Sequence, residues 1–106
     1  MSATASIDTG LPAALLDQLR GVFEGSPGVE AVWLFGSRAK GNFRSGSDID
    51  FAVEGKSLSF ADFLAIKAQL DDLVIPWTVD LLLLHQIDNP ALLEHIRRVG
   101  VPFYVR

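Results

Sequence analysis

The sequence predicts an α+β fold in which a small mixed β-sheet is covered by helices on one face. Segments whose apolar residues recur at helical spacing alternate with short apolar runs of strand length. The chain has 106 residues, of which 49% are hydrophobic and 21% are charged, a composition typical of a globular protein. This length is enough for one core between two layers, and it leaves little room for a second lobe.

The first half of the chain predicts one helix and one strand before a polar loop. Pro12 suits a first helical turn. Apolar residues then follow at helical spacing, namely Leu11, Leu15, Leu16, Leu19 and Phe23. Residues 25–28 break the chain with glycine, serine and proline. We interpret the apolar run 30–35 as a buried strand, and 36–47 as a loop rich in glycine, serine and basic residues.

The second half predicts three further strands and two helices. Residues 48–53 alternate, so Asp48, Asp50 and Ala52 face one way while Ile49, Phe51 and Val53 face the other. A pattern that resembles a capping box, Ser-x-x-Asp, begins a helix over about 59–73. Residues 78–84 predict a strand, 89–100 a helix that opens with Asn-Pro and closes with glycine, and 101–105 a final short strand.

Composition excludes several classes of protein and site. The net charge of -4 argues against a broad nucleic-acid-binding surface, which is usually basic. The chain has no cysteine, so disulfides, thiolate metal sites and cysteine nucleophiles are excluded. Residues 1–10 lack the features of a secretory signal, and we expect a flexible tail there before a single domain over 11–106. The longest aliphatic run, 81–84, is too short to span a bilayer, so we expect a cytoplasmic protein.

Three acidic residues lie within predicted strands: Asp48 and Asp50 in one, and Asp80 in another. Residues two apart on a strand share a face and lie roughly 6.6 Å apart along it. If the two strands are neighbours, the three carboxylates can converge, and they would then repel one another. A divalent cation removes this repulsion, and oxygen ligands select Mg²⁺ or Mn²⁺.

Each acid also has an ordinary explanation that the sequence leaves open. Asp48 with Ser47 can form a turn that starts a strand, Asp50 can face water, and Asp80 can pair with a lysine or arginine. Asp80 argues most strongly against these explanations, because apolar residues surround it at 79 and 81–84.

A Gly-Ser pair directly follows the first predicted strand. Gly36 permits a tight turn and close backbone approach, and a short helix from Ser37 would offer free N–H groups and a hydroxyl to phosphate oxygens. Arg38, Lys40 and Arg44 add positive charge nearby. An ordinary turn with solvated basic residues explains this pattern if it is taken alone. Next to the three acids, however, it predicts a phosphate cradle beside a metal site, which is what nucleotidyl transfer requires.

Two short motifs, G-S-R-A-K-G at 36–41 and S-D-I-D at 47–50, resemble the G-S-x-x-x-G-x-x-x-x-x-S-D-x-D signature of the DNA polymerase β nucleotidyltransferase superfamily. The small size and T-V-D-L at 78–81 are similar to its minimal nucleotidyltransferase branch. The resemblance covers the chain from about Val32 to its end, and it implies the two-layer nucleotidyltransferase fold.

The resemblance implies a role for each matched residue. Asp48 and Asp50 would bind two Mg²⁺ ions (or Mn²⁺), and Asp80 would complete the catalytic metal site and help to deprotonate the acceptor hydroxyl. ATP or another nucleoside triphosphate would be the substrate, and pyrophosphate would leave. The candidate nucleotide-binding residues are Gly36, Ser37, Arg38 and Ser47.

The resemblance also implies a partner protein. Larger members of the superfamily have an additional helical domain, whereas a lone small sheet offers only a shallow site. Minimal nucleotidyltransferases are typically encoded beside a small helical HEPN-type protein, and the pair often acts as a toxin–antitoxin system in which AMP is added to the partner. Residues 87–104 are similar to a subgroup whose helical partner is a substrate-binding subunit. We therefore expect a hetero- or homo-oligomer, and neither a membrane nor a nucleic acid as partner.

Two classes of function remain open at this point. The first is an enzyme that transfers a nucleoside monophosphate, with AMP expected, to a hydroxyl on the partner. The second is a binding module that holds nucleotide and metal without turnover and silences a toxin by covering it. Transfer to a small molecule such as an aminoglycoside ranks below both, since those enzymes are larger.

Overall fold

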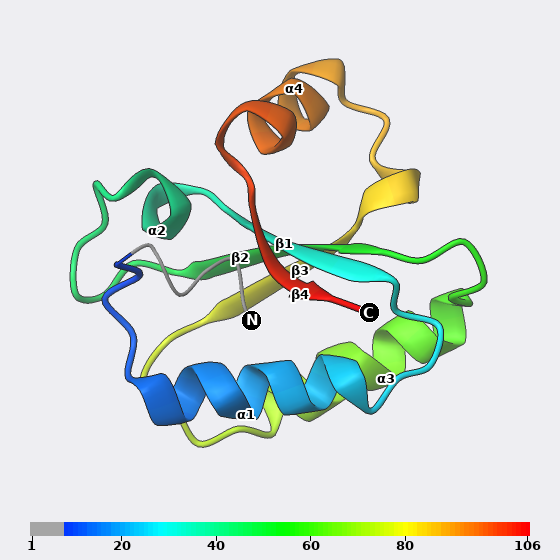
Figure 1. Cartoon of the computed structure of the whole chain (residues 1–106), viewed down its shortest axis with the longest axis horizontal. Coiled ribbons are helices and arrows are strands. Elements are labelled where there is room, and N and C mark those ends of the chain that lie inside the picture. The colour runs from blue at the N-terminus through cyan, green and yellow to red at the C-terminus, as the bar shows by residue number, and fades with distance from the viewer. Residues whose placement is uncertain (1–7) are drawn as a thin grey trace.

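The computed structural model describes residues 8–106, which form a mixed sheet with helices on both faces (Figure 1). The four strands of this described chain are β1 (Ala31–Phe35), β2 (Ile49–Glu54), β3 (Val79–Leu83) and β4 (Val101–Val105). Their order across the sheet is β3-β2-β1-β4. β1 pairs antiparallel with both β2 and β4, whereas β2 and β3 are parallel. The predicted α+β class with a small mixed sheet is therefore confirmed.

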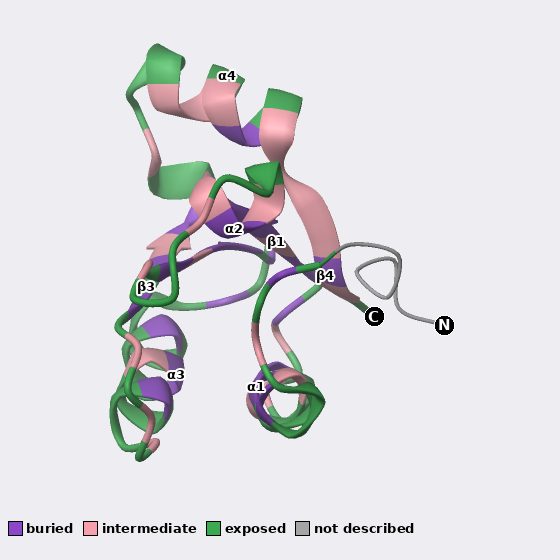
Figure 2. Cartoon of the chain, turned by 90° about the vertical axis from the view of Figure 1, so that its left-hand side faces the viewer, coloured by how far each residue is buried: buried purple, intermediate pink, exposed green. Residues whose placement is uncertain are grey.

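The helices cover the sheet unequally. Those of the described chain are α1 (Ala13–Glu24), α2 (Ser37–Lys40), α3 (Phe60–Asp71), the 3-10 turn η2 (Leu84–Gln86) and α4 (Pro90–Val99). α1 and α3 cover one face and α4 lies over the opposite face (Figures 1 and 2), so the prediction that helices cover only one face is wrong for α4. There Ile96 packs with Phe35 and Ala52 in a second, smaller core. None of these described helices has the length and apolar character needed to cross a membrane.

Strand alternation determines which residues each face presents. Phe51 points toward α1 and α3, where its ring lies 5.2 Å from that of Phe23 and 4.7 Å from that of Phe103. Its neighbours Asp50 and Ala52 therefore point toward the α4 side. β1 is apolar on both faces, because it packs against the main core on one side and α4 on the other.

Side-chain caps fix the starts of α3 and α4 where the sequence predicts them. The Ser59 hydroxyl accepts a 3.0 Å hydrogen bond from the backbone N–H of Asp62. The Asn89 side chain accepts from the N–H groups of Ala91 and Leu92 at 3.0 and 3.2 Å. Each cap satisfies N–H groups that have no partner within the helix.

The prediction of a flexible N-terminal tail needs correction at its C-terminal end. Residues 1–7 lie outside the described residues. Thr9, however, is only 4% exposed, and its carbonyl accepts a 2.7 Å hydrogen bond from Arg38 Nη1. Gly10, with φ of 72°, lies against the ring of Phe43. This segment packs mainly through its backbone, so its small polar residues give no sequence signal for the contact.

Candidate active site

Asp50 and Asp80 are direct neighbours on the α4 face of the sheet. They occupy the same register position on the parallel strands β2 and β3, whose backbones lie about 4.8 Å apart. The pKa of Asp50 is raised from 3.8 to about 6 by burial, then by the charges of Asp80 and Asp48, and by a hydrogen bond with Asp80. Asp80 is therefore close enough to Asp50 to influence the ionisation of its carboxyl.

Asp48 lies just before β2 and is exposed to solvent. Its charge still acts on Asp50, so it is close to the pair. Among residues 8–106, no lysine or arginine forms an ion pair with Asp48, Asp50 or Asp80. The pairing of Asp80 with a basic residue, one of the ordinary explanations, is thus not seen in the described chain.

The three carboxylates have the donor chemistry of a magnesium site, since each offers hard oxygen ligands and their mutual repulsion favours a divalent cation. Their side chains do not stand in a ready-made cage, because the described chain has no group of three or more histidine, cysteine or acidic side chains positioned to hold an ion. The donor set fits Mg²⁺ by its chemistry, and Asp48 and Asp80 are exposed and so accessible to an ion from solvent.

Gly36 brings the backbone of the turn after β1 directly against Asp50. Its φ of 74° lies in the left-handed region, and a Cβ at this position would collide with Asp50 Oδ2. Only glycine combines this backbone conformation with room for the neighbouring carboxylate. The predicted close approach of backbone at Gly36 is confirmed, and it occurs at the acid cluster.

We predict that Gly36→Ala lowers the free energy of unfolding by about 3 kcal/mol, because it adds a collision with Asp50 to the strain of positive φ. Gly41→Ala is the matched control, since Gly41 has φ of 85° but no atom within 4 Å of an added Cβ. It should cost about 1–2 kcal/mol. Urea unfolding of both variants measures the difference. Equal losses would show that the contact with Asp50 has no energetic weight.

The short helix α2 begins at Ser37, the residue from which the sequence allows a short helix to start. The carbonyls of Gly36 and Ser37 accept hydrogen bonds of 3.1 and 2.9 Å from the N–H groups of Lys40 and Gly41. The backbone N–H groups at the start of α2 have no partner within the helix. They directly follow Gly36, the residue that contacts Asp50. Backbone donors and carboxylates thus lie side by side.

The structure corrects the prediction for Arg38, a candidate nucleotide-binding residue. Arg38 is 1% exposed, and its guanidinium points into the loop that follows α2. It donates to the carbonyls of Thr9 (2.7 Å), Arg44 (3.4 Å), Ser45 (3.2 Å) and Ser47 (3.1 and 3.0 Å). With its donors committed to the protein, Arg38 shapes the loop instead of facing a phosphate.

Aromatic and hydroxyl groups complete this loop. The guanidinium of Arg38 lies 5.0 Å from the Phe43 ring centroid and 5.8 Å from that of Trp77. Trp77 Nε1 donates a 2.7 Å hydrogen bond to the Ser45 carbonyl. The Ser47 hydroxyl, another candidate nucleotide contact, accepts a 2.8 Å hydrogen bond from the N–H of Arg44. The loop is therefore fixed immediately before Asp48, a role for Trp77 that sequence reasoning missed.

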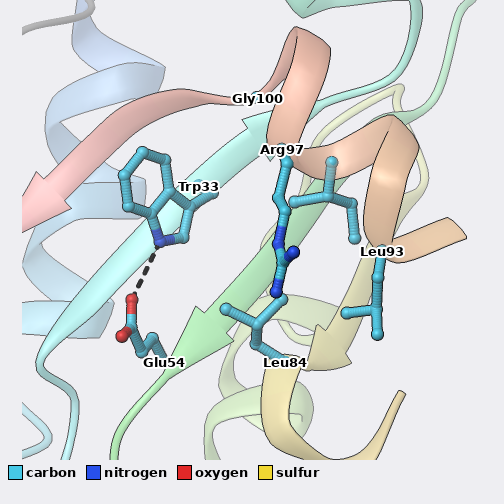
Figure 3. Close-up of a pocket in the computed structure, with 7 residues that line it drawn as sticks. Trp33, Glu54, Leu84, Leu93, Arg97 and Gly100 are labelled. Atoms are coloured by element: carbon cyan, nitrogen blue, oxygen red, sulfur yellow. Dashed lines mark hydrogen bonds between the residues drawn. The ribbon is translucent and has the colours of Figure 1, made fainter. Parts of the chain in front are cut away.

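Two adjoining hollows on the α4 side do not include the acids. They measure 260 and 510 Å³ and share Glu54, Leu84, Leu93 and Arg97 (Figure 3). Glu54 accepts a 3.1 Å hydrogen bond from Trp33 Nε1 at the edge of the smaller one. Glu54 lies four residues beyond Asp50, about 13 Å along β2. Asp48, Asp50 and Asp80 therefore lie outside these two hollows.

The match to a known protein family extends over most of the chain. Residues 17–106 match the family model described as "Polymerase beta, Nucleotidyltransferase". The chain therefore belongs to this family of nucleotidyltransferases. The resemblance indicated by its G-S and D-x-D motifs is confirmed.

Similar proteins place the chain near the minimal nucleotidyltransferases. A Haemophilus influenzae protein named "Probable protein adenylyltransferase MntA" is 43% identical over 54 residues, which cover 48% of this chain and 46% of that protein. The chain thus matches about half the length of this curated relative.

Solved structures share the fold. A toxin–antitoxin crystal structure with AMP-PNP has a TM-score of 0.69 at 22% identity, covering 86% of this chain and 73% of the other. A structure assigned as a minimal nucleotidyltransferase has a TM-score of 0.68 at 25% identity, covering 92% and 98%. A Shewanella oneidensis structure, a tri-AMPylated HEPN toxin with its MNT antitoxin, has a TM-score of 0.57 at 18% identity, covering 86% and 70%.

Proposed function

We propose that residues 11–106 act as one Mg²⁺-dependent domain that transfers AMP from ATP to a hydroxyl on a helical HEPN-type partner protein. The observation that carries this proposal is the position of Asp50, which lies against the backbone of Gly36 and interacts with Asp80 and Asp48, in a chain of the nucleotidyltransferase family. The relatives support the acceptor, since one is named for protein adenylyltransfer and another contains an AMPylated HEPN toxin.

Each residue of the cluster has a proposed task in this reaction. Asp48 and Asp50 would hold the metal ions, with Mn²⁺ able to replace Mg²⁺. The backbone N–H groups that follow Gly36 and the hydroxyl of Ser37 would hold the β and γ phosphates. Mg²⁺, when bound, neutralises the charge that develops on the phosphates during transfer. Asp80 accepts the proton of the acceptor hydroxyl. A bond forms between the acceptor oxygen and the α phosphorus, the bond from that phosphorus to the β-phosphate bridge breaks, and pyrophosphate leaves.

The proposal is tested with ATP labelled on the α phosphate, Mg²⁺ and the purified protein encoded by the adjacent gene. We expect label on the partner from α-labelled ATP and none from γ-labelled ATP, because pyrophosphate carries the γ label away. Asp80→Asn should reduce transfer at least about 100-fold. Asp17→Asn is the control, since Asp17 is exposed on α1 and its ion pair within residues 8–106 is with Arg20 at 3.5 Å. Label that persists when Asp48 and Asp50 are both changed to Asn would rule out the assigned site.

A second candidate is a binding module without turnover, and it is favoured because the described chain has no three acidic or histidine side chains already positioned to hold an ion. Such a module would silence a toxin by covering it. The two functions separate in cells that express the partner as a toxin. Equal protection by the wild-type chain and by Asp80→Asn supports binding, whereas loss of protection with an intact complex supports transfer.

A further inference from the structure

An apolar surface runs along the β3 edge of the sheet and onto α3. Its exposed part is Phe60, 54% exposed, and Leu64, 47% exposed, one turn apart on α3. Its recessed part is a hollow of 250 Å³ lined by Phe63, Leu81, Leu82, Leu83, Gln86 and Ile87. The rings of Phe60 and Phe63 stack at 5.9 Å, which joins the two parts. We call these residues the α3–β3 surface, and Figure 2 shows α3 below β3 at this side of the molecule.

Exposed apolar residues of this size are unusual on a helix that faces water. α3 buries Phe63, Ile66 and Leu70 toward the core, and yet Phe60 and Leu64 continue the apolar character onto a flank. β3 is an edge strand, so its outer side has no neighbouring strand in the described chain. Both elements are therefore left without a cover along the same side of the protein.

The charges around this surface indicate what covers it. The exposed acids of α3, β3 and the residues that follow each are Asp62, Asp71, Asp72, Asp80 and Asp88, and none forms an ion pair with a residue of the described chain. The basic residue on α3 is Lys67. A second copy that packed the same surface would bring acid against acid, which is destabilising. An apolar centre with an acidic rim instead suits a partner with apolar anchors and a basic rim.

We propose that the α3–β3 surface binds an amphipathic helix of the partner protein, with basic residues flanking its apolar face. The row of Phe60 and Leu64, four residues apart, is a ridge that packs into the groove of another helix. This inference rests on the proposed function, in which the partner protein carries the acceptor hydroxyl. Leu82 lines the hollow and lies two residues from Asp80 on the same face of β3, about 7 Å away. The recessed part of the surface therefore reaches the edge of the acid cluster, and a partner seated here lies beside it.

The test is the affinity of the purified HEPN-type protein encoded by the adjacent gene for the full chain, measured by calorimetry. Phe60→Glu combined with Leu64→Glu should weaken binding at least about 30-fold, as loss of an interface centre does. Val105→Glu is the matched control, because Val105 is a 65% exposed apolar residue on β4, the opposite edge of the sheet. It should change affinity by less than about twofold. Wild-type binding should also weaken as salt is raised.

A second variant and a second measurement keep the test decisive. Phe60→Ala, which adds no charge, should weaken binding about tenfold, and both variants should bind a fluorescent ATP analogue with Mg²⁺ like the wild type. Unchanged partner affinity in both variants overturns the inference, as does a wild-type homodimer that the double variant dissociates in light scattering. A complex that forms through this surface but transfers no AMP refutes the proposed function alone. AMP transfer with unchanged KM in the double variant refutes the docking surface alone.

Discussion

Asp50→Asn is expected to abolish nucleotidyl transfer and at the same time to stabilise the metal-free protein at pH 8. The two effects share one cause, since Asp50 is partly buried beside the like charges of Asp80 and Asp48. Its ionised form is therefore disfavoured by burial and by like charges. Asparagine keeps the shape and removes the charge. Loss of a metal ligand should reduce kcat at least about 10³-fold.

The pH window follows from the raised pKa of Asp50, about 6 in the folded chain against an ordinary 3.8. Below about pH 4 the carboxyl is protonated whether or not the chain is folded, and its stabilising protonated form is fully present. As pH rises from about 4 through 6, the unfolded chain releases this proton more readily than the folded chain does. The folded state therefore loses stability relative to the unfolded state. Because Asp50 is only half-buried, solvent screening limits the effect to about 1 kcal/mol.

Thermal unfolding in chelator at pH 4 and pH 8 measures the effect. The wild type should lose about 5 °C relative to Asp50→Asn between these values. Asp17→Asn, which removes an exposed carboxylate on α1, should follow the wild type. Added Mg²⁺ should raise the Tm of the wild type at pH 8 and leave Asp50→Asn unchanged. A variant less stable than the wild type at pH 8 would contradict the repulsion between these acids.

The acids could be predicted from the sequence because strand alternation assigns each residue to a face. Asp50 and Asp48 share a face by their spacing alone, and apolar neighbours mark Asp80 as unusual. Their convergence, however, requires β2 and β3 to be parallel neighbours in one register. Strand pairing is a long-range property that no local pattern contains. The sequence therefore predicts only that the acids can converge if the two strands are neighbours.

The place of α4 shows a second limit. Its apolar side, with Leu92 and Ile96, predicts a packed helix but does not say which face of the sheet it covers. Phe35 and Ala52 receive it on the face opposite α1 and α3. Their positions within apolar strands look the same in sequence as those that face the main core. The face that α4 covers is known only from the structure, in which β1 is buried on both of its faces.

Arg38 shows a third limit, and it leads to the largest expected loss of stability. Next to a Gly-Ser turn, a basic side chain predicts a phosphate contact, yet this one points inward to carbonyls. Every residue has a backbone carbonyl, so the residue types at positions 9, 45 and 47 do not indicate that these carbonyls accept hydrogen bonds from Arg38. The sequence cannot separate an arginine that builds the loop from one that binds the ligand.

Arg38→Ala should lower the free energy of unfolding by about 4 kcal/mol, because it removes the donor to the carbonyls of Thr9 and Ser47. It also opens a cavity beside the rings of Phe43 and Trp77. Arg38→Lys should cost about 2 kcal/mol, since one ammonium cannot reach carbonyls on both sides of the loop. Lys40→Ala, two residues further on and exposed, should change stability by less than about 0.5 kcal/mol. Urea unfolding measures all three.

The same variants separate a loop-building arginine from a nucleotide-binding one. If Arg38 holds the loop, Arg38→Lys loses stability without nucleotide, and its amide hydrogens near Asp48 exchange faster than those of Lys40→Ala. If Arg38 instead binds phosphate, Arg38→Lys keeps wild-type stability and loses only nucleotide affinity. The first outcome follows from the geometry, because the five hydrogen bonds of the guanidinium all end on carbonyls of the chain itself. Arg38 then positions Asp48 from its N-terminal side through the Ser47 carbonyl.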